Sequence, residues 1–148
     1  MSGRTKFNVS KNLAKRTYKG IVYDSEVEMK YYRDYIEPRI KNKEILSCEQ
    51  QVPYLLQEGF KHKKSHGKCV TVRKIEYVAD FVIHWSNGTT QIVDTKGMPD
   101  SVALLKRKLF WYKYPELDYI WISYCKKYGG WIEYDELKKL RSKNKRSK

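Results

Sequence analysis

Two apolar runs joined by a glycine-containing turn restrict most strongly how this chain can fold. Residues 77–85 read YVADFVIHW and residues 91–97 read QIVDTKG, with Asn87–Gly88 between them. An Asn-Gly pair flanked by such runs is a strong signal for a β-hairpin. The sequence therefore predicts two antiparallel strands near the middle of a sheet, with Asp80 inside the first strand and Asp94 inside the second.

The two acids also make a prediction about the register of this hairpin. Asp80 and Asp94 can lie opposite each other only if the numbers of paired residues sum to 174. Trp85 and Thr89 then close a three-residue loop. Such loops favour a left-handed residue at their third position, here Gly88. A two-residue turn would shift the register by one and place the acids on opposite faces, so a site that uses both acids predicts the longer loop.

A helix is expected before this hairpin, and it places one more acid toward the protein body. Ser25 is a helix N-cap candidate, and Glu28 three residues later completes a capping box. The helix is expected to end at about Glu37, because Pro38 disfavours helical geometry in the residue before it. On this helix Glu28 lies beside the apolar face, whereas Glu26 belongs to the solvated face.

The remaining elements complete an α/β chain with a mixed central sheet, the hairpin at its middle and helices flanking it. They are a short strand at 20–23, strand material at 45–58 bent at Pro53, a polar loop at 61–68, a strand at 70–85, a helix at 101–114 with Val102, Leu105 and Leu109 as its core stripe, a strand at 118–124 and a short helix at 134–140.

Basic residues are concentrated at the two ends of the chain. The formal net charge is +14, yet residues 21–137 hold 18 basic and 17 acidic residues. Residues 1–20 and 138–148 hold the other 13 basic residues and no acid. We interpret residues 1–20 as a basic flexible arm, 21–137 as the folded domain and 138–148 as a basic C-terminal tail. Such ends are typical of proteins that bind polyanions, although they can also serve solubility alone.

Composition and cysteine content predict a protein of the cytoplasm. Hydrophobic residues make up 41% and charged residues 32% of the chain, as in a soluble globular domain. No apolar run approaches the roughly 20 residues of a membrane helix, and the N-terminal residues contain no signal-peptide core. Three widely spaced cysteines do not suggest a disulfide framework.

The acids and one lysine form a pattern suited to metal-dependent chemistry. Asp80 lies in an apolar strand, where a charge needs a partner or a metal. Asp94 and Lys96 share one face of the next strand. Facing carboxylates favour Mg²⁺, with Mn²⁺ as a substitute. Lys96 could then orient the attacking water or stabilise the pentavalent phosphate of a phosphodiester hydrolysis. Glu28 could complete the metal shell, but a role of Glu28 in capping the helix explains its position equally well.

This pattern resembles the PD-(D/E)xK nuclease motif. The segments Asp24–Glu28, Tyr77–Phe81 and Val93–Gly97 are similar to those of a family of small phage proteins that includes Holliday junction resolvases. The resemblance implies a restriction-endonuclease-like fold and a homodimer that cuts branched DNA with Mg²⁺. It implies that Glu28, Asp80 and Asp94 are metal ligands, that Lys96 is catalytic, and that the Thr95 carbonyl can also bind metal. Ala79 replaces the Pro of the motif name, and Asp94 stands where Glu is more frequent.

Other interpretations of these residues remain open at this level. The same scaffold could serve a site-specific or restriction-type endonuclease on duplex DNA, and a non-catalytic nucleic-acid-binding protein would use only the basic ends. The row Lys61, Lys63, Lys64 can contact DNA or be a solvated loop. His62, His66 and Cys69 lack an obvious fourth zinc ligand. No small-molecule cofactor or membrane partner is expected, and the predicted DNA contacts are Arg4, Lys6, Lys11, Lys15, Arg16, Lys19, Lys63, Lys64 and Lys106.

Overall fold

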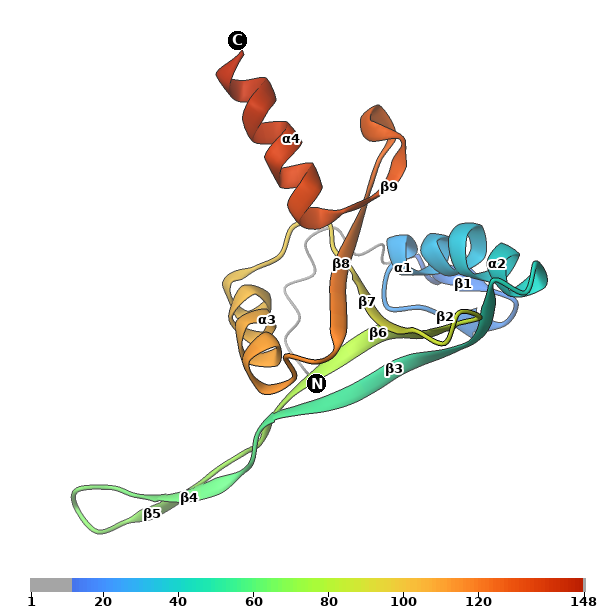
Figure 1. Ribbon diagram of the computed structural model, residues 1–148. Helices are drawn as coiled ribbons and strands as arrows, with labels where there is room; N and C mark the ends of the chain where they lie inside the picture. Colours follow the sequence, from blue (N-terminus) through green and yellow to red (C-terminus); the bar gives the residue numbers. More distant parts are fainter. Residues whose placement is uncertain (1–11, 148) are drawn as a thin grey trace.

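A mixed five-stranded sheet with helices on both faces forms the body of the protein (Figure 1), which confirms the predicted α/β class with a mixed sheet flanked by helices. The computed structural model describes residues 12–147. The strand order is β3-β6-β7-β8-β9, in which only the β7–β8 pair is parallel. The sheet strands are β3 (Ile45–Gln57), β6 (Ile75–Trp85), β7 (Thr90–Thr95), β8 (Asp118–Cys125) and β9 (Gly130–Glu133).

The other elements lie on the two faces or at the ends of this sheet. They are the 3₁₀ helices η1 (Leu13–Arg16) and η3 (Lys126–Tyr128), the strands β1 (Thr17–Tyr18), β2 (Ile21–Val22), β4 (Phe60–Lys63) and β5 (Cys69–Val72), the π-helix η2 (Tyr32–Ile36), and the helices α1 (Glu26–Tyr31), α2 (Glu37–Lys41), α3 (Ser101–Lys113) and α4 (Tyr134–Arg146). Among residues 12–147, no helix is long and apolar enough to cross a membrane.

Each face of the sheet has its own apolar core. On one face, Tyr31 and Ile36 from the α1–η2 segment pack with Phe81 and Val93. On the other, Phe110 from α3 packs against Ala79 and the aromatic residues of β8. Phe110 and Phe81 are both fully buried. The sheet is therefore the middle layer of three, and its central strands β6 and β7 are rich in buried apolar residues because both faces are covered.

The central hairpin has the predicted register. Phe81 pairs with Val93 and His84 with Thr90, so the paired numbers sum to 174. The Trp85 amide donates to the Thr89 carbonyl over 2.9 Å, which closes the three-residue loop. Gly88 has a φ of 90°, the left-handed conformation that glycine adopts without steric cost.

The first helical segment continues past the proline that was expected to end it. α1 leads through the π-helix η2 into α2, which includes Pro38 and ends at Lys41. The Glu37 amide donates to the Tyr32 carbonyl, five residues back. A proline ring clashes with the carbonyl four residues before it in a regular α-helix, and the wider π-turn just before Pro38 accommodates the ring.

Two predictions about strands were wrong in detail. β3 is one continuous strand of 13 residues rather than two strands bent at Pro53. The expected polar loop at 61–68 is mostly a hairpin, because β4 pairs with β5 over residues 60–63 and 69–72. The expected strand at 70–85 is accordingly divided between β5 and β6. Only the connection between Lys63 and Cys69 remains a loop.

The core stripe predicted for α3 was also wrong. Val102 and Leu105 are each 58% exposed, and only Leu109 of the three packs against a core. Arg107 takes the inward position instead, because its guanidinium lies 4.1 Å from the Trp121 ring centroid and pairs with Asp135 over 3.1 Å. Stacking and ion pairing let a charged side chain occupy a position that the sequence pattern assigns to the surface.

The two ends of the chain are more ordered, within the described residues, than the sequence predicted. Residues 12–20 of the predicted flexible arm form η1 and β1 and pack near α1. At the other end, the expected short helix at 134–140 continues to Arg146, so most of the predicted tail is helical. Asn144 donates to the Tyr128 hydroxyl over 2.6 Å and fixes this part of α4 to η3.

Candidate functional site

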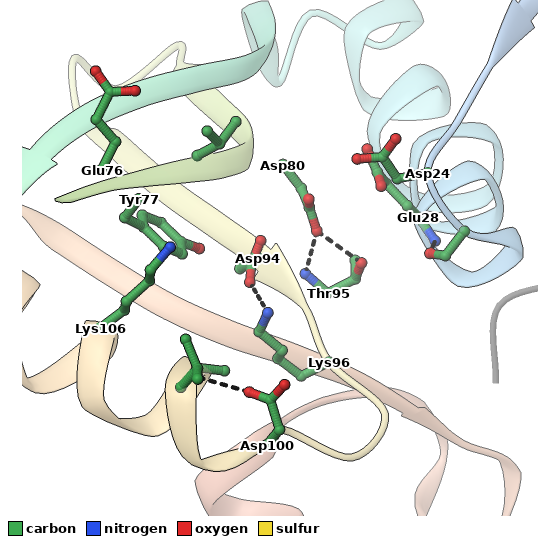
Figure 2. A pocket seen from close by; sticks show the side chains of 14 residues that line it. Asp24, Glu28, Glu76, Tyr77, Asp80, Asp94, Thr95, Lys96, Asp100 and Lys106 are labelled. Carbon is green, nitrogen blue, oxygen red and sulfur yellow. Dashed lines mark hydrogen bonds and ion pairs between the residues drawn. The ribbon is translucent and has the colours of Figure 1, made fainter. Parts of the chain in front are cut away.

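The residues predicted to carry chemistry line a single open cleft of about 350 Å³. The cleft lies where β6 and β7 meet the start of α1 and the first turns of α3. Figure 2 shows Asp80 and Asp94 on the two strands, Glu28 on the α1 side and Lys106 on the α3 side. Its lining consists of Asp24, Ser25, Glu28, Glu76, Tyr77, Val78, Asp80, Asp94, Thr95, Lys96, Asp100, Val102, Ala103 and Lys106.

In β6 the regular alternation of side chains between the two faces of the sheet is interrupted at Asp80. Ala79 packs in the α3 core, yet Phe81 two residues later packs in the α1 core. Residues two apart in a regular strand share a face, so the strand changes phase at Asp80. The pairing of β6 with β7 ends at Phe81 and Val93. Beyond it, Asp80 Oδ2 accepts hydrogen bonds from the Thr95 amide over 2.9 Å and from the Thr95 hydroxyl over 3.0 Å.

Asp94 and Lys96 form a tight ion pair at the end of β7. Lys96 Nζ lies 2.5 Å from Asp94 Oδ2, and Asp94 is 2% exposed. The buried Asp94 carboxylate is thus held beside the ammonium, and both residues line the cleft.

Both backbone polar groups of Lys96 form hydrogen bonds with β8. Its amide donates to the Ile122 carbonyl over 2.8 Å, and its carbonyl accepts from the Ser123 hydroxyl over 2.6 Å. Ser123 is itself 2% exposed. The side chain then passes over Trp121, with Nζ 5.3 Å from the ring centroid. These contacts restrict where the ammonium can lie, which is the preorganisation that a reacting site needs.

The cleft raises the proton affinity of Asp80. Burial raises the pKa of Asp80 well above its usual value, and the negative charges of Asp94 and Glu28 add to this effect. Burial and the charge of Asp94 also raise the pKa of Tyr77. Carboxylates that repel each other in a low-dielectric site favour binding of either a proton or a metal cation.

The backbone and the side chain of Glu28 have different partners. Ser25 accepts a hydrogen bond from the Glu28 amide over 3.1 Å and so caps α1. The Glu28 carboxylate, by contrast, accepts a hydrogen bond from Gln51 Nε2 over 2.8 Å, and the residue is 2% exposed. Its backbone therefore belongs to the cap, and its side chain belongs to the wall of the cleft.

Gln51 is a site residue that sequence reasoning missed. It lies in β3 between Gln50, which pairs with Phe81, and Val52, which pairs with Ala79, so it is level with Asp80. Its φ of 53° is left-handed, which is uncommon for glutamine and concentrates at functional sites. A glutamine in a polar stretch of strand gives no sequence signal for this conformation.

The predicted DNA-contact residues do not all reach the cleft. Lys106 lines it and extends beside Tyr77 (Figure 2). Lys63 and Lys64 lie on the β4–β5 hairpin, away from the cleft (Figure 1). Arg4, Lys6 and Lys11 lie outside the described residues.

The folded N-terminal segment engages two of the basic residues that were predicted to contact DNA. Lys15 is exposed. Arg16 donates to the carbonyls of Tyr23 and Asp24, and Lys19 pairs with Glu37 over 3.1 Å. Arg16 therefore fixes the entry to α1, whereas Lys15 and Lys19 are both exposed and Lys19 is partly neutralised by Glu37.

The metal-ligating capacity of the cleft rests on two carboxylates. Among residues 12–147, no three His, Cys, Asp or Glu side chains are grouped as a complete metal-binding set. Asp80 and Asp94 line the same cleft, and the pKa of Asp80 is raised first by burial and then by the charge of Asp94. Mg²⁺ is commonly held by one or two carboxylates, with waters and substrate phosphates as the other ligands. The donor set present therefore fits a hard divalent cation.

Comparison with protein families assigns the chain to one of them. A family model described as a protein of unknown function, DUF1064, matches residues 5–130. The chain belongs to the DUF1064 family. A search of curated proteins gives no match. In this DUF1064 protein the matched range includes Glu28, Asp80, Asp94 and Lys96 and ends before α4.

Proposed function

We propose that the protein is a Mg²⁺-dependent endodeoxyribonuclease of the PD-(D/E)xK type, with a restriction-endonuclease-like fold. The observation that carries the proposal is the meeting of Asp80, Asp94 and Lys96 in an open cleft where two paired sheet strands separate. An ion pair alone would account for Asp94 and Lys96. It would leave unexplained why Asp80 and Glu28 add further negative charge to the same buried site.

Asp80 and Asp94 would hold the metal, with Glu28 as a third contributor directly or through water and the Thr95 carbonyl as a further candidate. Bound there, a divalent cation polarises a phosphoryl oxygen, lowers the pKa of water and offsets charge on the leaving oxygen. The raised pKa of Asp80, caused first by burial and then by the negative charges of Asp94 and Glu28, supports cation binding. Mn²⁺ is expected to substitute, because it prefers the same oxygen ligands.

Lys96 has the position of a group that acts on the phosphate. Its side chain is 23% exposed, and its ammonium lies in the cleft, where it pairs with Asp94. A lysine there can orient the attacking water and stabilise the negative charge of the pentavalent phosphate. Lys106, on the opposite wall, is placed to contact the DNA backbone beside the scissile bond.

The preferred substrate in this proposal is a four-way DNA junction, and the active form is a homodimer in the cytoplasm. An open cleft suits a backbone that is read by shape, and the chain contains no long insertion for base readout. The twofold axis of a dimer would match the near-symmetry of a junction. Cutting of linear duplex DNA by the same site would instead indicate a restriction-type enzyme.

Cleavage of a synthetic four-way junction, beside a linear duplex of the same sequence, tests this function. The wild type is compared with Asp94→Asn and with Glu76→Gln, which removes a charge at the edge of the cleft where Glu76 pairs with Lys74. We expect symmetric Mg²⁺-dependent cuts in the junction that Asp94→Asn abolishes and Glu76→Gln retains. Binding without cutting in both Mg²⁺ and Mn²⁺ would identify a non-catalytic DNA-binding protein.

A further inference from the structure

The β4–β5 hairpin projects from the body as an isolated two-stranded ribbon (Figure 1). Every residue of β4 is exposed, including Phe60 at 47%. Isolated two-stranded hairpins are marginally stable in water. Its turn is closed by two backbone hydrogen bonds between Lys64 and the residues Gly67 and Lys68. A ribbon that protrudes without packing partners of its own is available for a ligand.

Positive charge is concentrated on this hairpin. Residues 59–74 contain six cations and no acid: Lys61, Lys63, Lys64, Lys68, Arg73 and Lys74. Lys74 pairs with Glu76 over 2.6 Å, and the other five have no ion-pair partner among the described residues. The rest of the segment 21–137 holds 12 basic and 17 acidic residues. The hairpin thus carries a large share of the positive charge of the domain at its most protruding point.

The two faces of the hairpin differ in chemistry. Lys61 pairs with Thr71 and Lys63 with Cys69, so these four side chains share one face. The other face carries Phe60, His62, Val70 and Val72 by the same pairing. A polar, basic face of two lysines with a threonine hydroxyl is complementary to the phosphates of a nucleic-acid backbone, which such side chains contact without reading sequence.

The hairpin is an extension of the strands that carry the cleft. β3 and β6, which hold Gln51 and Asp80, continue into β4 and β5. Gly59 at the junction approaches the Lys74 amide and the Val72 carbonyl so closely that a Cβ would lie 3.2 Å from each. Cys69 and Thr71 of the basic face lie on either side of Val70, which is ten residues from Asp80 in the sequence. At about 3.3 Å per residue, the basic face lies up to about 33 Å from the cleft.

We propose that the basic face of the β4–β5 hairpin binds the backbone of a duplex flank about one helical turn from the cleaved phosphate. Each base pair adds about 3.4 Å along a strand, so a reach of about 33 Å corresponds to about ten base pairs. The hairpin would then set a minimum length for the DNA flank. This inference rests on the proposed function in taking DNA as the ligand, and it does not depend on catalysis.

DNA binding in EDTA tests the hairpin without cleavage. Fluorescence anisotropy compares junctions and linear duplexes with flanks of 16 and 6 base pairs. The variant Lys61→Gln/Lys63→Gln is compared with Lys41→Gln/Lys43→Gln, which removes two exposed lysines at the opposite end of β3. At 0.1 M salt we expect the hairpin variant to lose roughly tenfold or more in affinity for long flanks. We also expect its salt slope to fall by roughly two.

Two features of the result distinguish this inference from a general charge effect. On short flanks the hairpin variant and the wild type should bind equally, and the control should match the wild type on both lengths. Equal affinity of wild type and hairpin variant for long flanks would overturn the proposal, as would an equal loss on short and long flanks. Light scattering adds a third arm: a changed oligomeric state with unchanged DNA affinity would mean that the hairpin contacts a second copy instead.

The same proteins assayed for Mg²⁺-dependent cleavage separate this proposal from the proposed function. Length-dependent binding without any cleavage would support the hairpin contact and reject the nuclease. Cleavage with no effect of the hairpin lysines on binding would support the nuclease and reject the hairpin contact.

Discussion

Replacing Gln51 separates two opposing contributions to stability. Its side chain donates a hydrogen bond of 2.8 Å to the buried carboxylate of Glu28, and hydrogen bonds to charged groups contribute about 1.5–3 kcal/mol. Its backbone, at a φ of 53°, is left-handed, which costs a residue with a side chain about 1–2 kcal/mol. Gln51→Ala removes the hydrogen bond and keeps the backbone cost, whereas Gln51→Gly removes both.

The glycine variant should therefore be more stable than the alanine variant, which is the reverse of the usual order in a strand. We expect Gln51→Ala to lower the free energy of unfolding by about 1.5–3 kcal/mol. At an interior strand position glycine is normally about 0.5–1 kcal/mol less stable than alanine. The relief of the left-handed backbone exceeds this loss, so Gln51→Gly should be about 0.5–1 kcal/mol more stable than Gln51→Ala. For a domain of this size that is roughly 1–4 °C in Tm.

Thermal and urea unfolding of both variants provide the measurement, and Glu49 provides the control. Glu49 lies in the same strand, is exposed and pairs regularly with Val82. Glu49→Ala should be more stable than Glu49→Gly, the reverse of the order at Gln51. The same order at both positions would refute the assignment of backbone strain to Gln51.

Three further predictions concern the core, the Arg107 contacts and the buried acids. Phe110→Ala should lower the free energy of unfolding by about 3–5 kcal/mol, whereas Tyr112→Ala on the same helix, at a site 89% exposed, should change it by less than about 0.5 kcal/mol in urea unfolding. Arg107→Ala should lower it by about 1–3 kcal/mol because it removes packing over Trp121. Asp135→Asn should cost less than about 1 kcal/mol, since Asp135 is 42% exposed, and equal losses would contradict the stacking. The raised pKa of Asp80 means that the folded state binds more protons than the unfolded state, so the stability of the wild type in EDTA should fall as pH rises above the usual Asp value of 3.8. Asp80→Asn should flatten this dependence in Tm measured from pH 4 to 8, and an unchanged slope would show that Asp80 is not its source.

Local chemistry explains why the hairpin and its acids could be predicted from the sequence. Asn87–Gly88 predicts that the two strands form a hairpin, and once the loop length is chosen, strand periodicity fixes which residues pair. Requiring Asp80 and Asp94 to meet selected the register with Gly88 at a positive φ, which the structure has. Each step uses residues that are close in sequence, and this is why the local sequence was enough to predict the hairpin register.

The features that could not be predicted depend on partners far away in the chain. Arg107 points inward on α3 because Trp121 and Asp135 receive it, and neither lies within the helix. Val102 and Leu105 therefore lose the core positions that their spacing suggests. Propensity and periodicity describe one element at a time, so a polar residue stabilised by another element is assigned to the surface.

The irregular backbone around Asp80 is a joint property of two strands. A single bulge would change the sum of paired residue numbers by one on one side of it. Across this site the sum is 131 both for Gln50 with Phe81 and for Val52 with Ala79. β3 and β6 therefore depart from regular pairing at the same level, one through the left-handed Gln51 and the other through the phase change at Asp80.

This paired departure accounts for how buried acids and apolar cores share the same strands. Because the phase changes at Asp80, Ala79 packs in one core and Phe81 in the other, and Asp80 is left to bond with Thr95. In a regular strand Ala79 and Phe81 would share a face. The same two acids placed on a regular hairpin would therefore not reproduce the cleft, because its geometry is set by the backbone of both strands as much as by the side chains.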